Sequence, residues 1–506
     1  MIDPAQDIER KRTEEIVKAP VLSALRATVL RPIAAVRPHY APLLLVYFSY
    51  GALGLIDISR DLWVKEQLSL SPAELASIGV WLTLPWTVKM VFGQLVDSVP
   101  FFGSQRRIYI IAGALIVAAG LLTLAGAAGG WLTFLPPAGL YILGAVLLVL
   151  GTVIQDVVAD AMSTEVVART DEDGEPREDG VVRAELGMVQ VLGRLALSAG
   201  ILAVAGLSGW VAAILTREKV FLLALIVPAV SLAGAFFASE KGVERRPIDW
   251  RILLGGIAFG SAVVAIGLLR VPFGQEIIFL LSMAVVCTML VFVTSGVAPD
   301  HRRAIFFSAI IIFAFRATPG VGDGYFWWTI DVLKFDETFY GILRQTAAII
   351  SVIVLWMFSK QLTEYSIPAV LFWLTVLGTI LSLPNVGLYY GLHEWAEANF
   401  GFGARSIAIV DAATSSPFVQ LSMVPLLALI AYYAPPGKRA TWFALMASLM
   451  NLALVAGQLF TKYLNEYFVV ARGEYSELGA LLLCAIAAGF LIPVITIALL
   501  GRKVAR

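Results

Sequence analysis

Basic side chains occur at three places inside long apolar stretches, where a charge is costly. Lys89, Arg194 and Arg316 each lie within such a stretch. At a rise of about 1.5 Å per residue, this places them roughly 12–16 Å deep. A cation near the middle of a bilayer costs about 2.5–3.5 kcal/mol on insertion scales. A chain keeps such groups where they face a wet cavity and bind anions, so the sequence predicts a central cavity for an anionic solute.

Acidic and aromatic residues accompany these cations. Arginine can bind a planar carboxylate with two donors, whereas a membrane-embedded aspartate can bind a donor edge of the substrate or carry a proton. The alternative is that the charges pair with one another as structural ion pairs that hold the two halves of the protein together. We assign substrate binding to Lys89, Arg194, Arg316, Asp156, Phe315 and Tyr325. We assign proton coupling or gating to Asp57, Arg60, Asp61, Asp160, Asp323 and Asp411.

A second charged group lies between two predicted spans. Gly93-Gln-Leu-Val-Asp97, followed by Arg106 and Arg107, resembles the loop motif between the second and third helices of major facilitators. An acid at one helix end and a base at the next can bridge in only one state of a rocking cycle. We therefore predict a cytoplasmic latch of Asp97, Arg106 and Arg107, which Asp160 or Glu165 could also join.

Composition places most of the chain in lipid. Of 506 residues, 59% are hydrophobic and 15% are charged, against about 25% charged in soluble domains. The net charge of zero gives no case for a nucleic-acid partner. The two cysteines and three histidines show no ligand spacing, so we expect no metal and no cofactor. The expected partners are an anionic small molecule, H⁺ and the bilayer, and we expect a monomer.

Fourteen segments are apolar enough to span a membrane, each needing about 20 residues. We predict spans at 41–63, 73–97, 107–128, 138–162, 183–206, 218–238, 250–270, 276–296, 304–329, 340–359, 366–387, 405–432, 440–463 and 478–501. Lys and Arg are in excess in the loops on the side of the N-terminus, which predicts that both termini are cytoplasmic. No signal peptide is evident, and we expect a multi-pass protein of a bacterial inner membrane.

An internal repeat predicts two related bundles. Residues 194–200, Arg-Leu-Ala-Leu-Ser-Ala-Gly, match residues 451–457, Asn-Leu-Ala-Leu-Val-Ala-Gly, at five of seven positions. With the six-plus-six layout, this favours parallel repeats and a major-facilitator fold with an inserted helix pair. The predicted organisation is a tail at 1–40, bundles at 41–240 and 301–506, and a linker with the inserted pair at 241–300.

Proline and glycine interrupt the ninth predicted span. Pro319-Gly-Val-Gly322 follows Arg316 directly. A broken helix near the midplane can free backbone groups for a ligand. Close packing against another helix is the alternative.

Several motifs together resemble the folate–biopterin transporter family. They are Pro85-Trp-Thr-Val-Lys89, the run from Phe92 to Arg107, Asp156-Val-Val-Ala-Asp160, Arg316-Ala-Thr-Pro319 and Phe335-Asp-Glu-Thr-Phe-Tyr-Gly341. The resemblance covers most of residues 41–465. It implies a major-facilitator fold, import of folates or pterins, and commonly proton coupling. It also implies that Lys89, Asp156, Asp160 and Arg316 are the charged motif residues. Gln155 and the run 162–165 depart from the pattern, which leaves the substrate open.

Three classes of function are therefore compared. The leading hypothesis is an H⁺-coupled importer of folate or a pterin-like anion that works by rocker-switch alternating access. A second is a transporter of another organic anion. A third is a non-transporting membrane factor for pigment handling or complex assembly, against which the midplane cations argue. No catalytic constellation or nucleotide-binding loop is present in the sequence, so we do not expect an enzyme.

Overall fold

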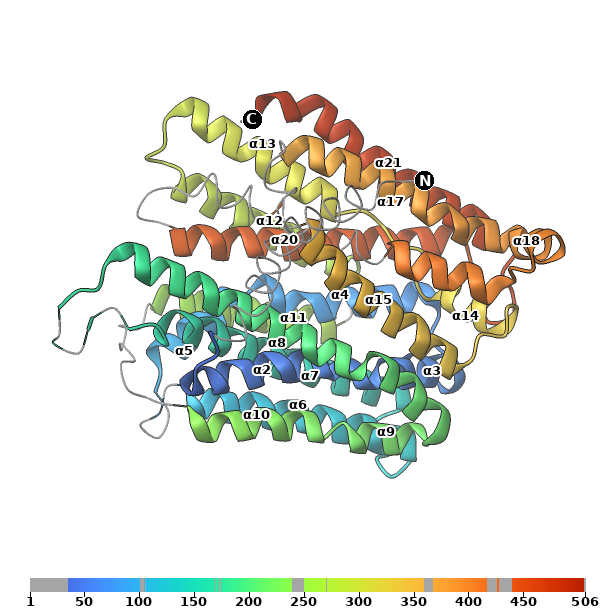
Figure 1. The fold of residues 1–506 in the computed structure, drawn as a ribbon, viewed down its shortest axis with the longest axis horizontal. Helices are drawn as coiled ribbons and strands as arrows, with labels where there is room; N and C mark the ends of the chain where they lie inside the picture. The colour runs from blue at the N-terminus through green and yellow to red at the C-terminus, as the bar shows by residue number, and fades with distance from the viewer. Residues whose placement is uncertain are drawn as a thin grey trace, which may run out of the picture.

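The protein is built of helices that lie side by side along one direction, as the computed structural model shows (Figure 1). The structure describes residues 35–504 apart from 101–103, 105, 169, 172, 174, 239–249, 270, 359–366, 416–425 and 427–438. This described part contains no β-strand, which confirms the all-helical prediction. Most of the predicted tail at 1–40 lies outside it.

The first half of the chain forms a group of helices that we call the amino-terminal helices. They are α2 (Ala41–Ala52), α3 (Asp57–Gln67), α4 (Pro72–Thr87), α5 (Lys89–Ser98), α6 (Arg107–Gly129), α7 (Pro137–Glu165), α8 (Asp179–Ile214), α9 (Arg217–Leu223) and α10 (Ile226–Phe237). The 3₁₀ turns η1 (Pro38–Tyr40) and η2 (Leu53–Ile56) precede α2 and α3. In Figure 1 most of this group fills the lower part of the molecule, in blue to green.

The remaining helices comprise a connecting pair and a second group, the carboxy-terminal helices. The pair is α11 (Trp250–Leu268) and α12 (Gly274–Val293). The second group is α13 (Pro299–Arg316), α14 (Asp323–Asp331), α15 (Glu337–Phe358), α17 (Ile367–Tyr389), α18 (Leu392–Phe400), α20 (Arg439–Tyr467) and α21 (Leu478–Leu500), with the 3₁₀ turn η3 (Gly501–Lys503). Residues 404–415 are also helical.

Nine helical segments of the described chain are long and apolar enough to cross a membrane. They are Pro38–Gln67, Arg107–Gly129, Pro137–Ser163, Val191–Ile214, Arg217–Phe237, Gly274–Val293, Pro368–Tyr389, Leu445–Tyr467 and Leu478–Lys503. The apolar helix Leu254–Leu268 is shorter. Three predicted spans are each divided by a break, at Val88, at 224–225 and at 317–322. Much of the span predicted at 405–432 lies outside the described residues. The predicted total of fourteen is therefore approximate.

The fifth predicted span differs most from the helix observed. Helix α8 runs from Asp179 to Ile214 over 36 residues, about 54 Å at 1.5 Å per residue. Its apolar part begins at Val191 rather than near residue 183. Because this helix is much longer than the roughly 30 Å hydrocarbon core, its polar first turns extend beyond the membrane.

The breaks in two spans are stabilised by side chains of α20. Asn451 donates a hydrogen bond of 3.1 Å to the carbonyl of Trp86, next to the break between α4 and α5. At the second break, the hydroxyl of Thr461 accepts a 2.9 Å hydrogen bond from the backbone N–H of Gly320. Asn465 donates to the carbonyl of Val321 at 3.1 Å. Packing against a neighbouring helix therefore satisfies backbone groups that the interrupted helices leave unpaired.

Two helix pairs join the amino-terminal helices to the carboxy-terminal helices: α4 packs along α20, and α8 packs along α15. The backbones of α8 and α15 approach closely, since a Cβ atom added at Gly209 would lie 2.6 Å from the Cα of Gly341. The N–H of Gly206 also donates to Oε1 of Gln345 at 2.8 Å. These contacts lie toward the end where α8 finishes and α15 begins. The predicted orientation places this end outside the cell, and we call it the outer end.

The sequence repeat has equivalent packing in the two halves. A Cβ atom at Gly200 would lie 2.1 Å from the carbonyl oxygen of Phe48 in α2. At the matching Gly457 it would lie 2.8 Å from the carbonyl oxygen of Thr318, just after α13. Each shared glycine thus lets its helix touch the backbone of the first span in its own half, which supports the predicted relation between the bundles.

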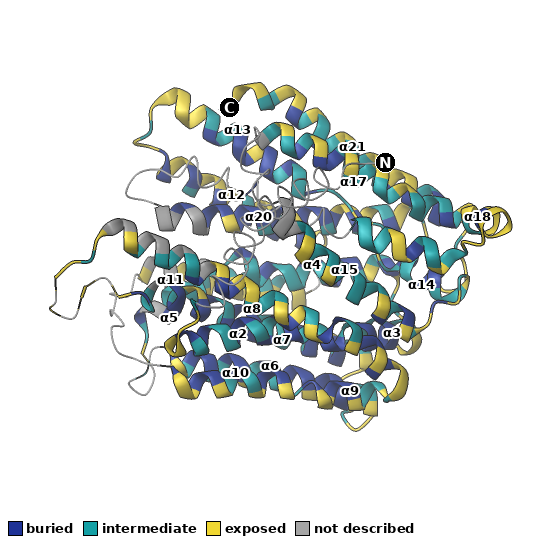
Figure 2. Ribbon diagram, in the orientation of Figure 1, coloured by how far each residue is buried: buried dark blue, intermediate teal, exposed yellow. Residues whose placement is uncertain are grey.

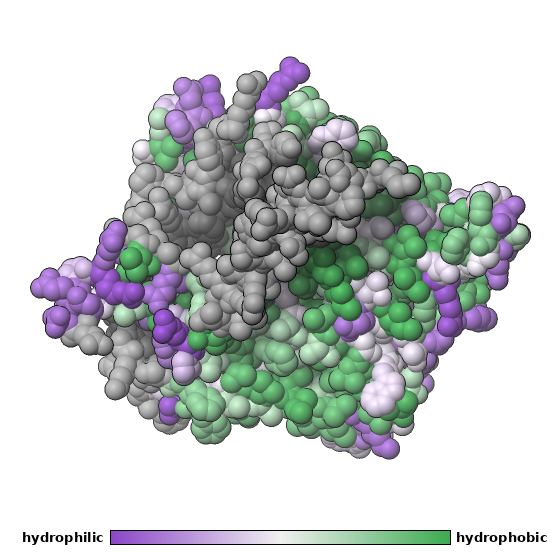
Figure 3. All heavy atoms as spheres, in the orientation of Figure 1, coloured by the Kyte–Doolittle hydropathy of each residue, from purple (hydrophilic) through white to green (hydrophobic). Residues whose placement is uncertain are grey.

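Burial and hydropathy fit a protein surrounded by lipid. Buried residues lie mainly where helices face one another, as along α2, α6 and α7 (Figure 2). Large apolar side chains such as Phe236, Leu268 and Phe292 are instead exposed. On the face shown in Figure 3, hydrophobic residues occupy the middle and hydrophilic residues gather at the left and right ends. This is the distribution expected of a membrane-spanning bundle.

Candidate functional site

A cavity of about 810 Å³ lies between α2, η2, α7, α8 and α15, and so has walls from both groups of helices. Its polar and aromatic lining includes Tyr50, Asp57, Arg60, Trp86, Arg194 and Arg344. Thr152, Ser198 and Ser351 add hydroxyl groups, and leucine, isoleucine, valine and alanine form most of the remainder. A largely apolar cavity of this size with a few polar groups is typical of small-molecule sites.

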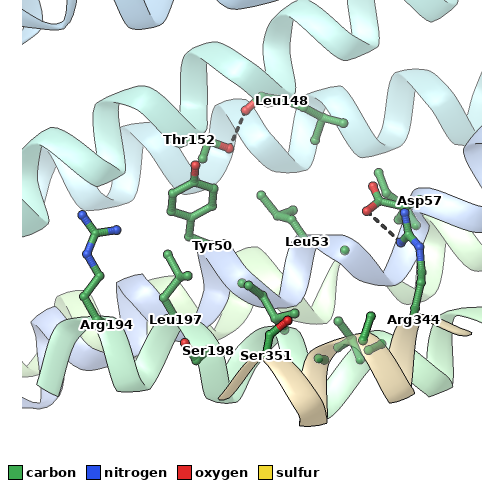
Figure 4. A pocket seen from close by; sticks show the side chains of 18 of the residues that line it. Tyr50, Leu53, Asp57, Leu148, Thr152, Arg194, Leu197, Ser198, Arg344 and Ser351 are labelled. Carbon is green, nitrogen blue, oxygen red and sulfur yellow. Dashed lines mark hydrogen bonds and ion pairs between the residues drawn. The ribbon is translucent and has the colours of Figure 1, made fainter. Parts of the chain in front are cut away.

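One end of the cavity carries Arg194 (Figure 4). This side chain projects from α8 and forms no ion pair with any residue in the described ranges. On the neighbouring wall, the rings of Tyr50 and Trp86 are stacked, with centroids 5.8 Å apart and planes inclined by 21°. This end therefore offers a cation with free donors beside an aromatic surface.

The other end of the cavity holds a network of opposite charges (Figure 4). The 3₁₀ turn η2 leads into α3, so that Asp57 and Arg60 lie on successive turns. Asp57 accepts from Arg344 of α15 at 2.9 Å and pairs with Arg60 at 3.2 Å. Arg60 also pairs with Asp61 at 2.9 Å. Arg344 thus links the two groups of helices through Asp57, and an anion that enters could compete for it.

Lys89 lies outside the cavity lining, in a cluster between α5 and α7 in which Asp156 is largely buried and Asp160 is exposed. Its Nζ is 2.5 Å from Oδ2 of Asp156 and 2.5 Å from Oδ2 of Asp160. The hydroxyl of Tyr47 in α2 donates to Oδ1 of Asp160 at 2.6 Å. The break at Val88 places Lys89 at the first position of α5, facing α7. Lys89 is thus ion-paired within the amino-terminal helices, and its pairs do not join the two groups of helices.

The predicted residues of the carboxy-terminal helices do not line this cavity. Arg316 ends α13, and Phe315 packs against the hydrophobic core of these helices. Tyr325 donates to Asn385 at 2.8 Å, while Asp411 accepts from Ser415. Asp323 begins α14. None of them belongs to the lining that contains Arg194.

The two arginines of the predicted latch bond to different residues among the contacts described. Arg106 is buried, donates through Nε to Glu165 at 2.9 Å and donates to the carbonyl of Val96 at 3.0 Å. Arg107 donates to the carbonyls of Ala235 and Ala238, each at 3.1 Å. The side chain of Asp97 lies outside the described part. Arg106 thus fixes the end of α7 against α5 within the amino-terminal helices.

Polar contacts also join the two groups at the outer end, and we call this set the outer clamp: Lys65, Trp327, Asp331, Arg472 and Tyr475. Lys65 lies 2.5 Å from Asp331, which also accepts from Tyr475. Burial raises the pKa of Asp331, but the bonds from Lys65 and Tyr475 outweigh burial and hold that pKa below its ordinary value.

Arg472 is the most highly connected member of the outer clamp. It donates to the carbonyls of Val64, Lys65 and Leu68 at 3.2, 2.7 and 2.5 Å. Its guanidinium also lies over the ring of Trp327, 4.3 Å from the centroid. Arg472 thereby binds the carboxyl end of α3, where free carbonyls favour a cation.

Several residues of the site are not among the predicted site residues. Tyr47, Tyr50, Trp86 and Arg344 all surround the charged groups, and the motif that contains Lys89 also contains Trp86. Aromatic residues are common in spans, so only the fold distinguishes those that face the cavity. In the described part, no group of three or more His, Cys, Asp or Glu is placed to hold a metal ion.

These features define a helical membrane transporter of the major-facilitator fold. The chain belongs to the BT1 family, whose model matches residues 51–505. It is 26% identical over 441 residues to the folate-biopterin transporter of Synechocystis sp., covering 87% of this chain and 77% of that protein. It is 21% identical to the probable folate-biopterin transporter 4 of Arabidopsis thaliana, covering 86% and 89%.

Solved structures agree on the fold. A POT family transporter in complex with 5-aminolevulinic acid superposes with a TM-score of 0.63, covering 92% of this chain and 96% of that chain at 14% identity. A second POT family complex, with a thioalcohol-conjugated peptide, gives a TM-score of 0.64 at 13% identity, covering 94% and 100%. At this identity the likeness establishes the shared architecture alone.

Proposed function

We propose that the protein is a secondary transporter that imports folate or a related pterin-like organic anion together with protons. Alternating access by a rocker-switch motion would expose the cavity to each side in turn. The observation that carries the proposal is a cavity walled by both groups of helices, with an arginine at each end. We further propose that it acts as a monomer in a bacterial inner membrane with both termini cytoplasmic.

The lining of the cavity supports an elongated anion with a flat ring. Arg194 has donors to offer a carboxylate, and Arg–carboxylate bonds are strong because they are charge-assisted and often bidentate. The stacked pair of Tyr50 and Trp86 offers a face to an aromatic heterocycle. Arg344 and Asp57 at the other end present both a donor and an acceptor. The names of the curated relatives point to the same substrates.

Closure at the outer end supports alternating access. The contacts of α8 with α15 and the outer clamp bridge the two groups of helices near that end. Such contacts must break if the cavity is to open outward, so they behave as a gate. Three charged residues of the motif, Lys89, Asp156 and Asp160, lie on the inner side of the cavity. They supply groups for proton coupling.

Uptake of radiolabelled folate into proteoliposomes tests the function. With an inward proton gradient, we expect accumulation that a protonophore abolishes. Arg194→Gln should reduce initial uptake at least tenfold, because one charge-assisted carboxylate contact is worth about 1.5–3 kcal/mol. Arg405→Gln is the matched control, since Arg405 lies outside the cavity and binds Asp336 on its own half.

Competition identifies the substrate class. Unlabelled folate, biopterin and a simple dicarboxylate are added in excess to the same assay. Inhibition by folate and biopterin supports a pterin-like substrate, whereas inhibition by the dicarboxylate alone favours the second candidate, another organic anion. Absence of folate uptake by the wild-type protein, with intact protein in the vesicles, would refute the proposed substrate.

A further inference from the structure

We propose that Asp156 and Asp160 together bind the transported proton, and that Arg194 makes this binding depend on the substrate. The inference rests on the proposed function in taking the substrate to be an anion held at Arg194 and the coupled ion to be a proton. It assigns the proton to a specific pair of carboxyl groups and assigns Arg194 a second role beyond substrate recognition.

The ion cluster carries more acid than base. One ammonium, that of Lys89, lies 2.5 Å from both Asp156 and Asp160. Two ionised carboxylates on one lysine leave a single negative charge in excess. The side chain of Asp156 is only 12% exposed. The side chain of Asp160 is 49% exposed, so the excess charge is costly where it falls on Asp156, and a proton or a further cation near Asp156 would offset that cost.

Arg194 is that further cation. Lys89 on α5 and Tyr47 on α2 bond to the carboxylate pair. Arg194 on α8 lines the neighbouring cavity together with Tyr50 on α2. Arg194 interacts electrostatically with both Asp156 and Tyr47. With Lys89 it supplies two positive charges, equal in number to the two carboxylates.

Tyr47 connects the pair mechanically to α8. Its hydroxyl donates to Asp160 at 2.6 Å. Its ring lies against Gly193, where an added Cβ would come within 2.8 Å of Cε2. Arg194, which lines the cavity, follows Gly193 directly. Tyr47 therefore contacts both the carboxylate pair and the part of α8 that carries Arg194.

Substrate binding then changes the charge balance. When an anion binds Arg194, the guanidinium charge is neutralised and no longer compensates the excess carboxylate. A proton from water adds to one carboxylate oxygen of the pair, giving a carboxylic acid, and no other bond changes. Because coupling between two ligands is reciprocal, proton binding must strengthen anion binding by the same factor. Anion and proton are therefore loaded together.

The first experiment needs no substrate. Neutralising Arg194 should mimic the bound anion, so in Arg194→Gln the pair should bind its proton at a pH about one unit or more higher than in the wild type, the effect of one nearby charge at an effective dielectric of about 20. The readout is the carboxylic C=O band in pH-difference infrared spectra of the purified full-length protein. Subtracting spectra of the same variant with added Asp160→Asn assigns the band to the pair.

Arg194→Lys is the matched control, because it keeps the charge. It should titrate like the wild type while Arg194→Gln shifts. Equal midpoints for Arg194→Gln and the wild type would overturn the inference. So would a shift of the same size in Arg194→Lys, because that would trace the effect to altered packing rather than charge.

The second experiment counts protons. Folate binding is measured by titration calorimetry in two buffers of different ionisation enthalpy, which gives the protons taken up per folate. We expect about one for the wild type and close to zero for Asp160→Asn with folate binding retained, since the variant has no excess charge to neutralise. Binding of folate to the wild type without proton uptake would overturn the inference. If no folate binds, the proposed substrate is refuted, and the infrared titration decides the coupling on its own.

Discussion

Removing the side chain of Arg472 should favour the conformation in which the outer end of the molecule is open. Arg472 donates to three carbonyls of the α3 terminus and stacks on Trp327. A buried bond from a charged donor contributes about 1.5–3 kcal/mol, but Arg472 is exposed, so we take about 0.5 kcal/mol for each bond. Adding about 0.5 kcal/mol for the cation–π contact and subtracting about 1 kcal/mol for ordering the side chain leaves a net of about 1 kcal/mol.

That free energy corresponds to a change of about fivefold in the ratio of outer-open to outer-closed protein. The assay is pulsed electron paramagnetic resonance between spin labels at Phe134 and Tyr390, which are exposed at the outer ends of the two groups. Both native cysteines, Cys287 and Cys484, are exposed and must first be replaced by alanine. We expect Arg472→Ala to increase the ratio of the long-distance to the short-distance population about fivefold.

Arg405→Ala is the control for this measurement. Arg405 also stacks on an aromatic ring, Phe339, at 5.0 Å and also pairs with an acid, Asp336, at 2.5 Å. All three residues belong to the carboxy-terminal helices, so the loss of these contacts should leave the distance distribution unchanged. An unchanged distribution in Arg472→Ala, or an equal change in Arg405→Ala, would refute the role of the outer clamp as a gate.

Two further predictions concern packing and pH. Gly200→Ala should destabilise the protein by about 1–3 kcal/mol, because its Cβ would lie 2.1 Å from the carbonyl oxygen of Phe48. Thermal denaturation in detergent should show a lower midpoint for this variant. The control Gly93→Ala should be neutral or stabilising, since no atom lies within 4 Å of the Cβ that it adds. Burial raises the pKa of Asp331. The bonds that its carboxylate accepts, including the bond from Lys65, outweigh burial and lower that pKa below the ordinary carboxyl value. Asp331 should therefore stabilise the outer-closed state fully at pH values above the ordinary carboxyl pKa. This stabilisation should be lost as the pH falls through the lowered pKa of Asp331. The spin-label distances should lengthen on acidification in the wild type and be independent of pH in Asp331→Asn; the same pH response in both would exclude Asp331 as its source.

Local sequence patterns were sufficient to predict the class of protein and much of its helical structure. Apolar runs of membrane length predict spans because lipid requires every backbone group to bond within its own helix. The motif around Lys89 predicts the family, and Pro319 with its glycines predicts a broken helix. Ser71 and Glu74 form a capping box at the start of α4, a local signal for a helix start.

The partners of the charged residues depended on the fold. Lys89 meets acids 67 and 71 residues away, and Arg344 meets Asp57 across 287 residues. A position inside a span fixes the depth of a side chain but not the direction in which it points, which follows from how each helix is rotated and packed. Arg194 and Arg316 lie at similar depths inside their apolar stretches, yet only Arg194 lines the cavity described here.

The sequence by itself determined that this chain is a helical membrane protein of one transporter family with costly charges inside its spans, because hydropathy and motifs are properties of neighbouring residues. Only the tertiary structure decided that Lys89 is held by two aspartates, that Arg194 faces the cavity and that the outer clamp joins the halves. Such contacts form between helices far apart in the chain, and their geometry is set by packing rather than by any local pattern.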